Sequence, residues 1–324
     1  MTTRRVARGG RNPKDLPRDQ QVSRKVSWLL RHGANQEGLK LGKGGYVSVQ
    51  DALNTRALKS LNITFPELRA MVAENDKQRF SMILASSLSD SSNITSSPVN
   101  RLESEAFDPT PKSDDPSDYI IRANQGHSIS VETEGLLTEV SEESGNVPEL
   151  CVHGTDEPAW RLILKSGGLR CMGRNHIHFA SGLPRGFKSM DQGIAATVEG
   201  KDAPHVISGM RKSSTILIYI NIRAAMAHGI KFFLSENGVV LTEGNEKGVL
   251  SYEFFEMVES RKKGGGVLMR DGVLPDDVEV DIRGWEKDIS DARSLKRSRK
   301  GKERSGRGGK ARVNDDSRDV FVGV

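Results

Sequence analysis

The sequence predicts an α+β protein built from two compact units, and three observations lead to this prediction. Helical patterns dominate residues 21–83, strand patterns dominate residues 150–252, and strands do not alternate with helices as they would in a βαβ fold. The chain of 324 residues exceeds the usual size of one domain. Only 35% of its residues are apolar, which indicates that part of the chain is linker or tail.

The first unit is predicted to contain three short helices followed by a hairpin. The first helix has apolar residues at helical spacing and ends near Gly33. Ser48 and Thr64 are predicted to cap the next two helices, because an acidic residue follows each of them three positions later. Strands at 79–84 and 119–123 are expected to pair as the hairpin. Three helices followed by strands is the order of a winged-helix-like unit, a common nucleic-acid-binding shape.

The second unit begins at the strand pattern of Leu150–His153 and contains mostly short strands, which favours mixed or antiparallel sheets. An acidic stretch rich in Ser and Pro interrupts the first unit and is expected to be flexible. The predicted division is a disordered basic tail (1–20), the winged-helix-like unit (21–131) with its flexible insertion (85–118), a linker (132–148), the strand-rich unit (149–285) and a disordered basic tail (286–324).

The formal net charge of +5 is unevenly distributed along the chain. Basic residues are concentrated in the two tails and in the first unit, which favours a polyanion such as nucleic acid as the partner. Two cysteines are too few for a disulfide framework, so an intracellular compartment, nucleus or cytoplasm, is expected. No apolar run approaches the roughly 20 residues that span a bilayer, so no membrane role is expected. The oligomeric state is left open.

Four local patterns contain residues suited to chemistry on a phosphate group. Arg offers a permanently charged fork that matches phosphate oxygens, and His can donate a hydrogen bond or move a proton near neutral pH. Ordinary structural roles are alternatives, because an Arg-His pair can complement a helix dipole and Gln-Gly-His-Ser can form a turn. The four patterns are Ser27–His32, Arg122–Ser128, His153–Thr155 and Arg174–Ala180.

Other chemistries have less support in the sequence. His176 and His178 are two residues apart and would share one face of a strand, but no further ligand has metal-site spacing, so no metal is expected. The chain contains neither a Walker A sequence nor a G-x-G-x-x-G fingerprint, which argues against P-loop and Rossmann chemistry.

The four patterns in this order, followed by Asn237-Gly-Val239, closely resemble the NAD-dependent tRNA 2′-phosphotransferases of the ADP-ribosyltransferase superfamily. The resemblance covers roughly residues 23–258. It implies a winged-helix-like RNA lobe followed by an ADP-ribosyltransferase-like lobe, with the active site between them. The boundary predicted near residue 148 agrees with that arrangement.

The resemblance also implies roles for individual residues. Arg31, His32, Arg122 and Arg211 would be the catalytic group that engages the RNA 2′-phosphate. A glutamate that is common in the superfamily is replaced by Val239, and an anionic phosphate nucleophile does not need that strong base. The residues implied to bind NAD are His153, Gly154, Thr155, Arg174, His178 and Val239.

The reaction implied by the resemblance moves an internal 2′-phosphate from RNA, expected to be the splice junction of ligated tRNA, to NAD. The phosphate first attacks the ribose carbon that carries nicotinamide, which gives an ADP-ribosylated 2′-phosphate. The ribose 2″-hydroxyl then attacks phosphorus, so that the products are 2′-OH RNA, nicotinamide and ADP-ribose 1″,2″-cyclic phosphate. The alternatives are an ADP-ribosyltransferase acting on nucleic-acid ends or protein, and a non-catalytic RNA-binding protein.

Overall fold

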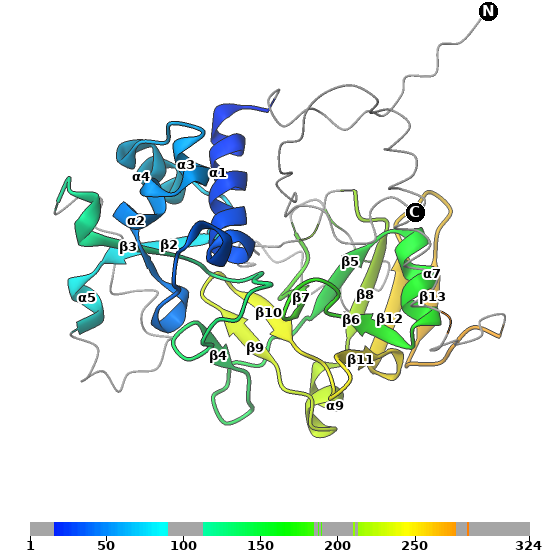
Figure 1. The fold of residues 1–324 in the computed structure, drawn as a ribbon. Helices are drawn as coiled ribbons and strands as arrows, with labels where there is room; N and C mark the ends of the chain where they lie inside the picture. Colours follow the sequence, from blue (N-terminus) through cyan, green and yellow to red (C-terminus); the bar gives the residue numbers. More distant parts are fainter. Residues whose placement is uncertain are drawn as a thin grey trace, which may run out of the picture.

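The structure, a computed structural model, describes residues 16–89, 113–184, 187, 189, 210, 213–276 and 284. The fold is α+β, as predicted, and Figure 1 shows two lobes side by side. The core of the first lobe is built from side chains between Val22 and Ala123. The main core of the second lobe is built from side chains between Val140 and Met269.

The first lobe opens with helix α1, which runs over Arg18–Trp28 and continues as a π-helical turn, Leu29–Gly33. The helix begins before residue 20, inside the stretch predicted to be a tail, because the Arg18 guanidinium binds Glu67 at 2.6 Å and the Leu61 carbonyl at 2.7 Å. Residues 1–15 and the predicted C-terminal tail from residue 286 lie outside the described residues. The other helices of this lobe are α2 (Val49–Asn54), α3 (Arg56–Lys59), α4 (Phe65–Ala73) and α5 (Ser86–Ser89).

The predicted helix caps and hairpin of the first lobe are confirmed. The Ser48 hydroxyl accepts a hydrogen bond from the N–H of Asp51, and the Thr64 hydroxyl accepts one from the N–H of Glu67. The antiparallel hairpin is closed by the pairs Phe80↔Ala123 at one end and Leu84↔Tyr119 at the other. Its strands β2 and β3 form a three-stranded sheet with β1, and the bounds are β1 (Val47–Ser48), β2 (Phe80–Leu84) and β3 (Tyr119–Ala123).

The predicted insertion, 85–118, joins the two strands of this hairpin. Its described ends form α5 and a 3-10 turn, Pro116–Asp118, and its central part lies outside the described residues. The chain therefore enters and leaves the insertion at the Leu84↔Tyr119 end of the hairpin.

The second lobe is built on an eight-stranded sheet in which every neighbouring pair is antiparallel. Its order is β13-β12-β8-β5-β7-β10-β9-β4, and β6 pairs separately with β11. The strands are β4 (Leu137–Glu139), β5 (Val152–Thr155), β6 (Gly168–Arg170), β7 (Ile177–Ala180), β8 (Ile216–Ile220), β9 (Phe233–Ser235), β10 (Val239–Thr242), β11 (Val249–Ser251), β12 (Phe255–Ser260) and β13 (Val267–Arg270).

The stretch predicted to be a linker, 132–148, contributes strand β4 to the edge of this sheet. The side chains of this strand are exposed or half-buried. A strand without a buried face needs no alternation of apolar residues, so the sequence pattern did not predict it. Leu136 and Val140, which flank the strand, are buried and fix it to the lobe. The chain thus joins the second lobe before the predicted boundary.

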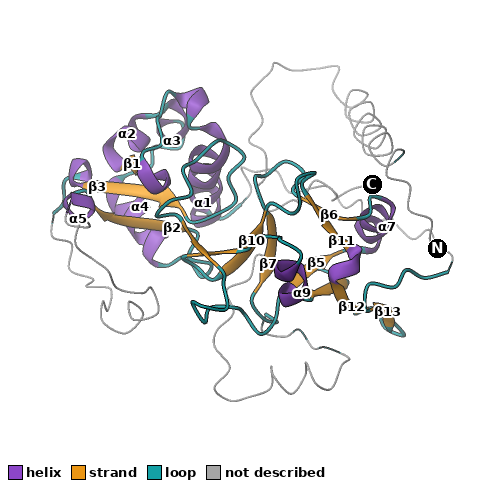
Figure 2. Ribbon diagram, turned by 90° about the horizontal axis from the view of Figure 1, so that it is seen from below, coloured by secondary structure: helices purple, strands orange, loops and turns teal. Residues whose placement is uncertain are grey.

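The two faces of the large sheet are covered differently. Helices α7 (Glu157–Lys165) and α9 (Ile222–Ala227) contribute to the main core on one face (Figure 2). A smaller apolar cluster, which includes Val152, Tyr219 and Met210, lies on the other face. Within the described ranges, no helix combines the length and the apolar character needed to cross a membrane.

Candidate functional site

Arg31 and His32 lie in the π-helical turn that ends the first helix of the chain. Single π-helical turns are often found at functional sites because they change the direction of side chains within a helix. The Arg31 side chain is only 4% exposed, and its carbonyl accepts a hydrogen bond from the N–H of Ser128 at 3.0 Å. The turn therefore places an arginine and a histidine beside the Gln125-Gly-His-Ser128 segment.

Gly33 closes this turn against the Trp28 ring. A Cβ at position 33 would lie 2.6 Å from a ring carbon of Trp28, closer than real Cβ contacts allow. We expect Gly33→Ala to lower the free energy of unfolding by about 1–3 kcal/mol, because the ring or the turn must shift. Urea denaturation would measure this loss. Gly266→Ala is the matched control, since a Cβ there meets nothing within 4 Å; equal losses in the two variants would contradict the prediction.

The Gln125–Ser128 segment packs directly on the Arg31 side chain. Gly126 has a φ of +90°, and a Cβ built on it would lie 3.4 Å from the Arg31 guanidinium. The His32 Nδ1 lies 2.7 Å from the Ser128 hydroxyl oxygen. Glycine suits this position because a φ of +90° is strained for a residue with a side chain.

The Arg174–Ala180 segment of the second lobe contacts the first lobe next to the Gln125–Ser128 segment. The N–H of Asn175 donates to the His127 carbonyl at 2.9 Å, and its side-chain amide donates to the Ile129 carbonyl at 2.9 Å. These two hydrogen bonds fix the start of β7 against the first lobe. Arg174 and His178 are thereby brought close to Arg31.

His178 has its imidazole Nε2 enclosed, and that atom makes no hydrogen bond with the described residues. Burial lowers the pKa of His178 well below its usual value, and the positive charges of Arg174 and Arg31 lower it further. The ring is therefore neutral at physiological pH, and both arginines are near enough to act on it.

The lowered pKa of His178 predicts how stability changes with pH. Below about pH 6.5, the ordinary value for histidine, the unfolded chain binds a proton that the folded chain does not. The stability contributed by the neutral ring is therefore complete above that pH and is lost as the pH falls below it. Urea denaturation between pH 8 and pH 5.5 should show a steeper loss for the wild type than for His178→Gln. Parallel profiles would show that His178 is not the responsible group.

The His153–Thr155 motif lies in β5 and forms a side-chain contact with the adjacent strand β7. The His153 Nδ1 lies 2.9 Å from the His178 carbonyl, and since a carbonyl only accepts, this nitrogen carries the proton. The His153 ring makes an edge contact with Phe179 in the main core, so the two histidine rings lie on opposite faces of the sheet. The Thr155 carbonyl accepts from the N–H of Thr215.

Gly154 and Val239 lie on the same face of the sheet as His178. The register pairs Val152 and Val239 with Ala180, and alternate residues of a strand share a face. A Cβ at Gly154 would lie 2.5 Å from the Met210 sulfur, so Met210 packs where another residue would have a side chain. Val239 is buried. This face therefore offers a glycine backbone and a neutral imidazole close to two arginines.

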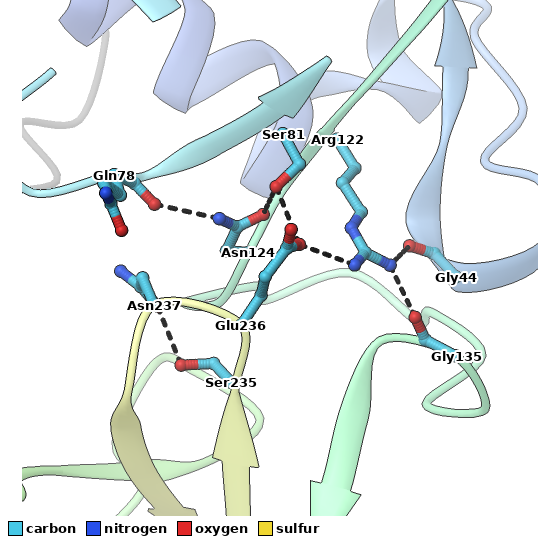
Figure 3. A network of polar contacts seen from close by, with 9 residues as sticks. All are labelled: Gly44, Gln78, Ser81, Arg122, Asn124, Gly135, Ser235, Glu236 and Asn237. Carbon is cyan, nitrogen blue, oxygen red and sulfur yellow. Dashed lines mark hydrogen bonds and ion pairs between the residues drawn. The ribbon is translucent and has the colours of Figure 1, made fainter. Parts of the chain in front are cut away.

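Arg122 makes a separate set of contacts. Its guanidinium binds the Glu236 carboxylate at 2.7 Å and the carbonyls of Gly135 and Gly44 at 2.6 and 3.2 Å (Figure 3). It also stacks on the Tyr46 ring. Arg211 lies outside the described residues. Arg31, implied for the RNA phosphate, and Arg174, implied for NAD, both act on the imidazole of His178, and His32 contacts Ser128.

Comparison with known proteins decides the family. Residues 17–244 match the model of the RNA 2′-phosphotransferase, Tpt1 / KptA family. The chain belongs to this family. The chain is 34% identical to tRNA 2′-phosphotransferase 1 of Danio rerio over 279 residues, covering 86% of this chain and 98% of the relative.

More distant relatives agree with that match. The chain is 34% identical to tRNA 2′-phosphotransferase 1 of Homo sapiens over 75% of this chain and 77% of the relative. It is 29% identical to tRNA 2′-phosphotransferase of Saccharomyces cerevisiae over 69% and 79%. The predicted resemblance is confirmed, and the chain is a transferase of the RNA 2′-phosphotransferase type.

Two charged residues beside the site of this RNA 2′-phosphotransferase were not selected from the sequence. The Arg79 carbonyl accepts from the N–H of Asn124, and the Glu236 carboxylate accepts from the Ser81 hydroxyl and the Arg122 guanidinium. Glu236 lies in the turn between β9 and β10. Neither belongs to a distinctive motif, so only strand pairing and contacts between the lobes could single them out. Among the described residues, no cluster of His, Cys, Asp or Glu is arranged to hold a metal ion.

Proposed function

We propose that this enzyme removes the internal 2′-phosphate of spliced tRNA and transfers it to NAD. The relatives reported above are named tRNA 2′-phosphotransferases, which supports tRNA as the substrate. The observation that carries the proposal is the meeting of Arg31, His32, Arg174 and His178, which come from both lobes. Two arginines brought together from the two lobes suit a phosphate group.

The first lobe would act as a winged-helix-like RNA-binding unit and the second as an ADP-ribosyltransferase-like unit. Helices α1 to α4, followed by the β2–β3 hairpin of a three-stranded sheet, support the first assignment. The antiparallel sheet with two covering helices supports the second. The boundary would lie within 132–148, with β4 already part of the second lobe.

The RNA 2′-phosphate would be held by Arg31, His32 and Arg174. Phosphoryl transfer increases the negative charge on the phosphate oxygens, and fixed donors aimed at those oxygens stabilise the transition state. His32 is the candidate acid or base, with Ser128 orienting its ring through Nδ1. Arg211 stays a candidate fourth ligand from the part of the chain that is not described.

NAD would bind on the sheet face that carries Gly154, His178 and Val239. The residues fit such a ligand, because the enclosed Nε2 of neutral His178 offers a polar contact on this face. His153 and Thr155 would shape this face through the strand contacts described above. NAD would supply the ribose that accepts the phosphate. Val239 supplies no base, which is consistent with a phosphate that is already an anionic nucleophile.

One assay tests the proposed function. A 2′-phosphorylated oligonucleotide is incubated with the protein and NAD, and an identical oligonucleotide with a 2′-hydroxyl is the control. We expect loss of the 2′-phosphate, release of nicotinamide and formation of ADP-ribose 1″,2″-cyclic phosphate. An ADP-ribosylated RNA as the final product would instead identify an ADP-ribosyltransferase, and binding without any product would identify a non-catalytic RNA-binding protein.

A further inference from the structure

Strand β12 carries a buried carboxyl group on the face of the large sheet that holds the smaller apolar cluster. Glu259 is 0% exposed and pairs in register with Leu217 of β8. The Tyr219 hydroxyl donates to one of the Glu259 carboxyl oxygens at 2.7 Å. Burial and this hydrogen bond raise the pKa of the Tyr219 phenol, so the phenol keeps its proton and donates. Enclosing a carboxyl group costs free energy unless hydrogen bonds compensate it, which makes its other contacts informative.

The other contacts at this end of β12 reach the connection between β7 and β8. The Ser189 hydroxyl donates to the second carboxyl oxygen of Glu259 at 3.3 Å. The Arg261 guanidinium lies 3.7 Å from the centroid of the Phe187 ring and donates to the Ser214 carbonyl at 2.8 Å. Two alternate residues, Glu259 and Arg261, thus bind described residues near both ends of the β7–β8 connection.

This polar group lies on the sheet face that is proposed to bind NAD. The register pairs Tyr219 with Val152 of β5, and Val152 with Ala180 of β7, so the three side chains share one face across neighbouring strands (Figure 1). Two residues further along the strands, alternation brings Gly154 and His178 to the same face as neighbours. The Tyr219 hydroxyl and the His178 imidazole therefore share a face, and only β5 lies between their strands.

Met210 links the polar group to the surroundings of His178. Its side chain packs against the same apolar cluster that contains Tyr219 and Phe187. A Cβ at Gly154 would lie 2.5 Å from the Met210 sulfur, so Met210 packs directly on the Gly154 backbone, in the position next to His178. The β7–β8 connection thus contributes a side chain to the surface beside the imidazole.

We propose that Tyr219 and Glu259 are positioning residues for NAD, because they hold the β7–β8 connection, and with it Met210, in place beside His178. This inference rests on the proposed function of the sheet face. Neither residue needs to touch NAD, since His178 offers the polar contact and the connection shapes the surface next to it. A buried group with fixed donors and acceptors suits this role, because it permits one arrangement of the connection where apolar packing alone permits several.

Steady-state kinetics with varied NAD and varied RNA would test the proposal. Glu259→Ala should raise KM for NAD by on the order of 10-fold and leave KM for 2′-phosphorylated RNA unchanged, because the altered contacts lie on the NAD face. Glu259→Gln keeps an acceptor for the Tyr219 hydroxyl and should lose less. Tyr219→Phe removes only the hydroxyl and should raise KM for NAD as well. Because the hydroxyl acts through the carboxyl group, adding Tyr219→Phe to Glu259→Ala should cause no further loss.

The matched control is Val258→Ala on the same strand. Val258 is 0% exposed but belongs to the main core on the other face, so this variant should lose stability without a change in KM for NAD. Amide hydrogen exchange at Phe187, whose N–H donates to the Pro184 carbonyl at 2.9 Å, gives a readout independent of catalysis. Exchange there should become faster in Glu259→Ala and Tyr219→Phe and should keep the wild-type rate in Val258→Ala.

The inference is overturned if Tyr219→Phe and Glu259→Gln both keep the wild-type KM for NAD and the wild-type exchange at Phe187. It is also overturned if Glu259→Ala changes only KM for RNA, or if Val258→Ala raises KM for NAD equally, because the effect would then follow stability. If Glu259→Ala does not fold, Tyr219→Phe decides the result.

Calorimetric titration with NAD alone separates this inference from the proposed reaction. The affinity for NAD should fall in Tyr219→Phe and stay unchanged in Val258→Ala. A wild-type protein that binds NAD but removes no 2′-phosphate would refute the proposed reaction. The affinities of the variants and the exchange at Phe187 would then still decide whether Tyr219 and Glu259 position NAD.

Discussion

An enzyme carrying Arg31→Ala is expected to remove the RNA 2′-phosphate about 10²–10³-fold more slowly than the wild type, mainly through kcat. Arg31 is almost fully buried beside Gly126 and is fixed by the π-helical turn, so its guanidinium is preorganised to meet charge that develops on the phosphate. Nicotinamide release should continue when phosphate loss from the RNA slows, because Arg31 acts on the phosphate. Parallel assays of the two products would measure this difference.

The control for Arg31→Ala is Lys40→Ala, which removes an exposed cation from the same lobe. It should retain wild-type rates. Equal losses in both variants would mean that general positive charge, and not the Arg31 site, drives the reaction. Loss of nicotinamide release alone, with phosphate removal unaffected, would place Arg31 in the NAD site and reverse its proposed role.

Arg174→Ala is expected to cause a loss of about 10²-fold or more in phosphate removal. The reason is position, since Arg174 and Arg31 act on the same imidazole of His178. A double variant of Arg31 and Arg174 should lose less than the product of the single losses, because both would serve one phosphate group. The test is to compare the rates of 2′-phosphate removal by the wild type, the two single variants and the double variant.

A second readout for Arg174 does not depend on catalysis. Its positive charge is the second cause, after burial, of the lowered pKa of His178, so that pKa should rise in Arg174→Ala. NMR titration of the His178 ring would measure it. Arg161→Ala is the matched control, since Arg161 is exposed on α7 and binds only Glu157 in its ion pair. If Arg211→Ala abolished phosphate removal while Arg174→Ala kept the wild-type rate, Arg211 and not Arg174 would bind the RNA 2′-phosphate, as the resemblance implies.

Elements defined by local patterns could be predicted from the sequence. The caps at Ser48 and Thr64 depend on residues three positions apart, and the strand Ile216–Ile220 is an unbroken apolar run that is buried throughout. Elements defined by distant partners could not. Strand β12 contains Glu259, a residue type expected at the surface, yet Glu259 is 0% exposed because the Tyr219 hydroxyl donates to it at 2.7 Å.

The same limit applies to the site. The motifs that contain Arg31, Gly126, Arg174 and His178 could be selected from the sequence, but motif order does not state which of their side chains meet. The contact between Arg122 and Glu236, which are 114 positions apart, could not be predicted from the sequence. Ion pairs over such separations depend on how two lobes dock, and no short-range pattern encodes them.

The β2–β3 hairpin has its two ends in different surroundings. One end, at Phe80↔Ala123, leads directly into the Asn124–Ser128 segment beside Arg31, whereas the other, at Leu84↔Tyr119, is where the insertion departs. Four residue steps separate the ends, roughly 14 Å at the rise of an antiparallel strand. Sequence length can therefore be added or removed at the outer end while the active-site end keeps its geometry. For protein engineering, this makes the insertion the natural position for an affinity tag or a fluorophore on a working enzyme.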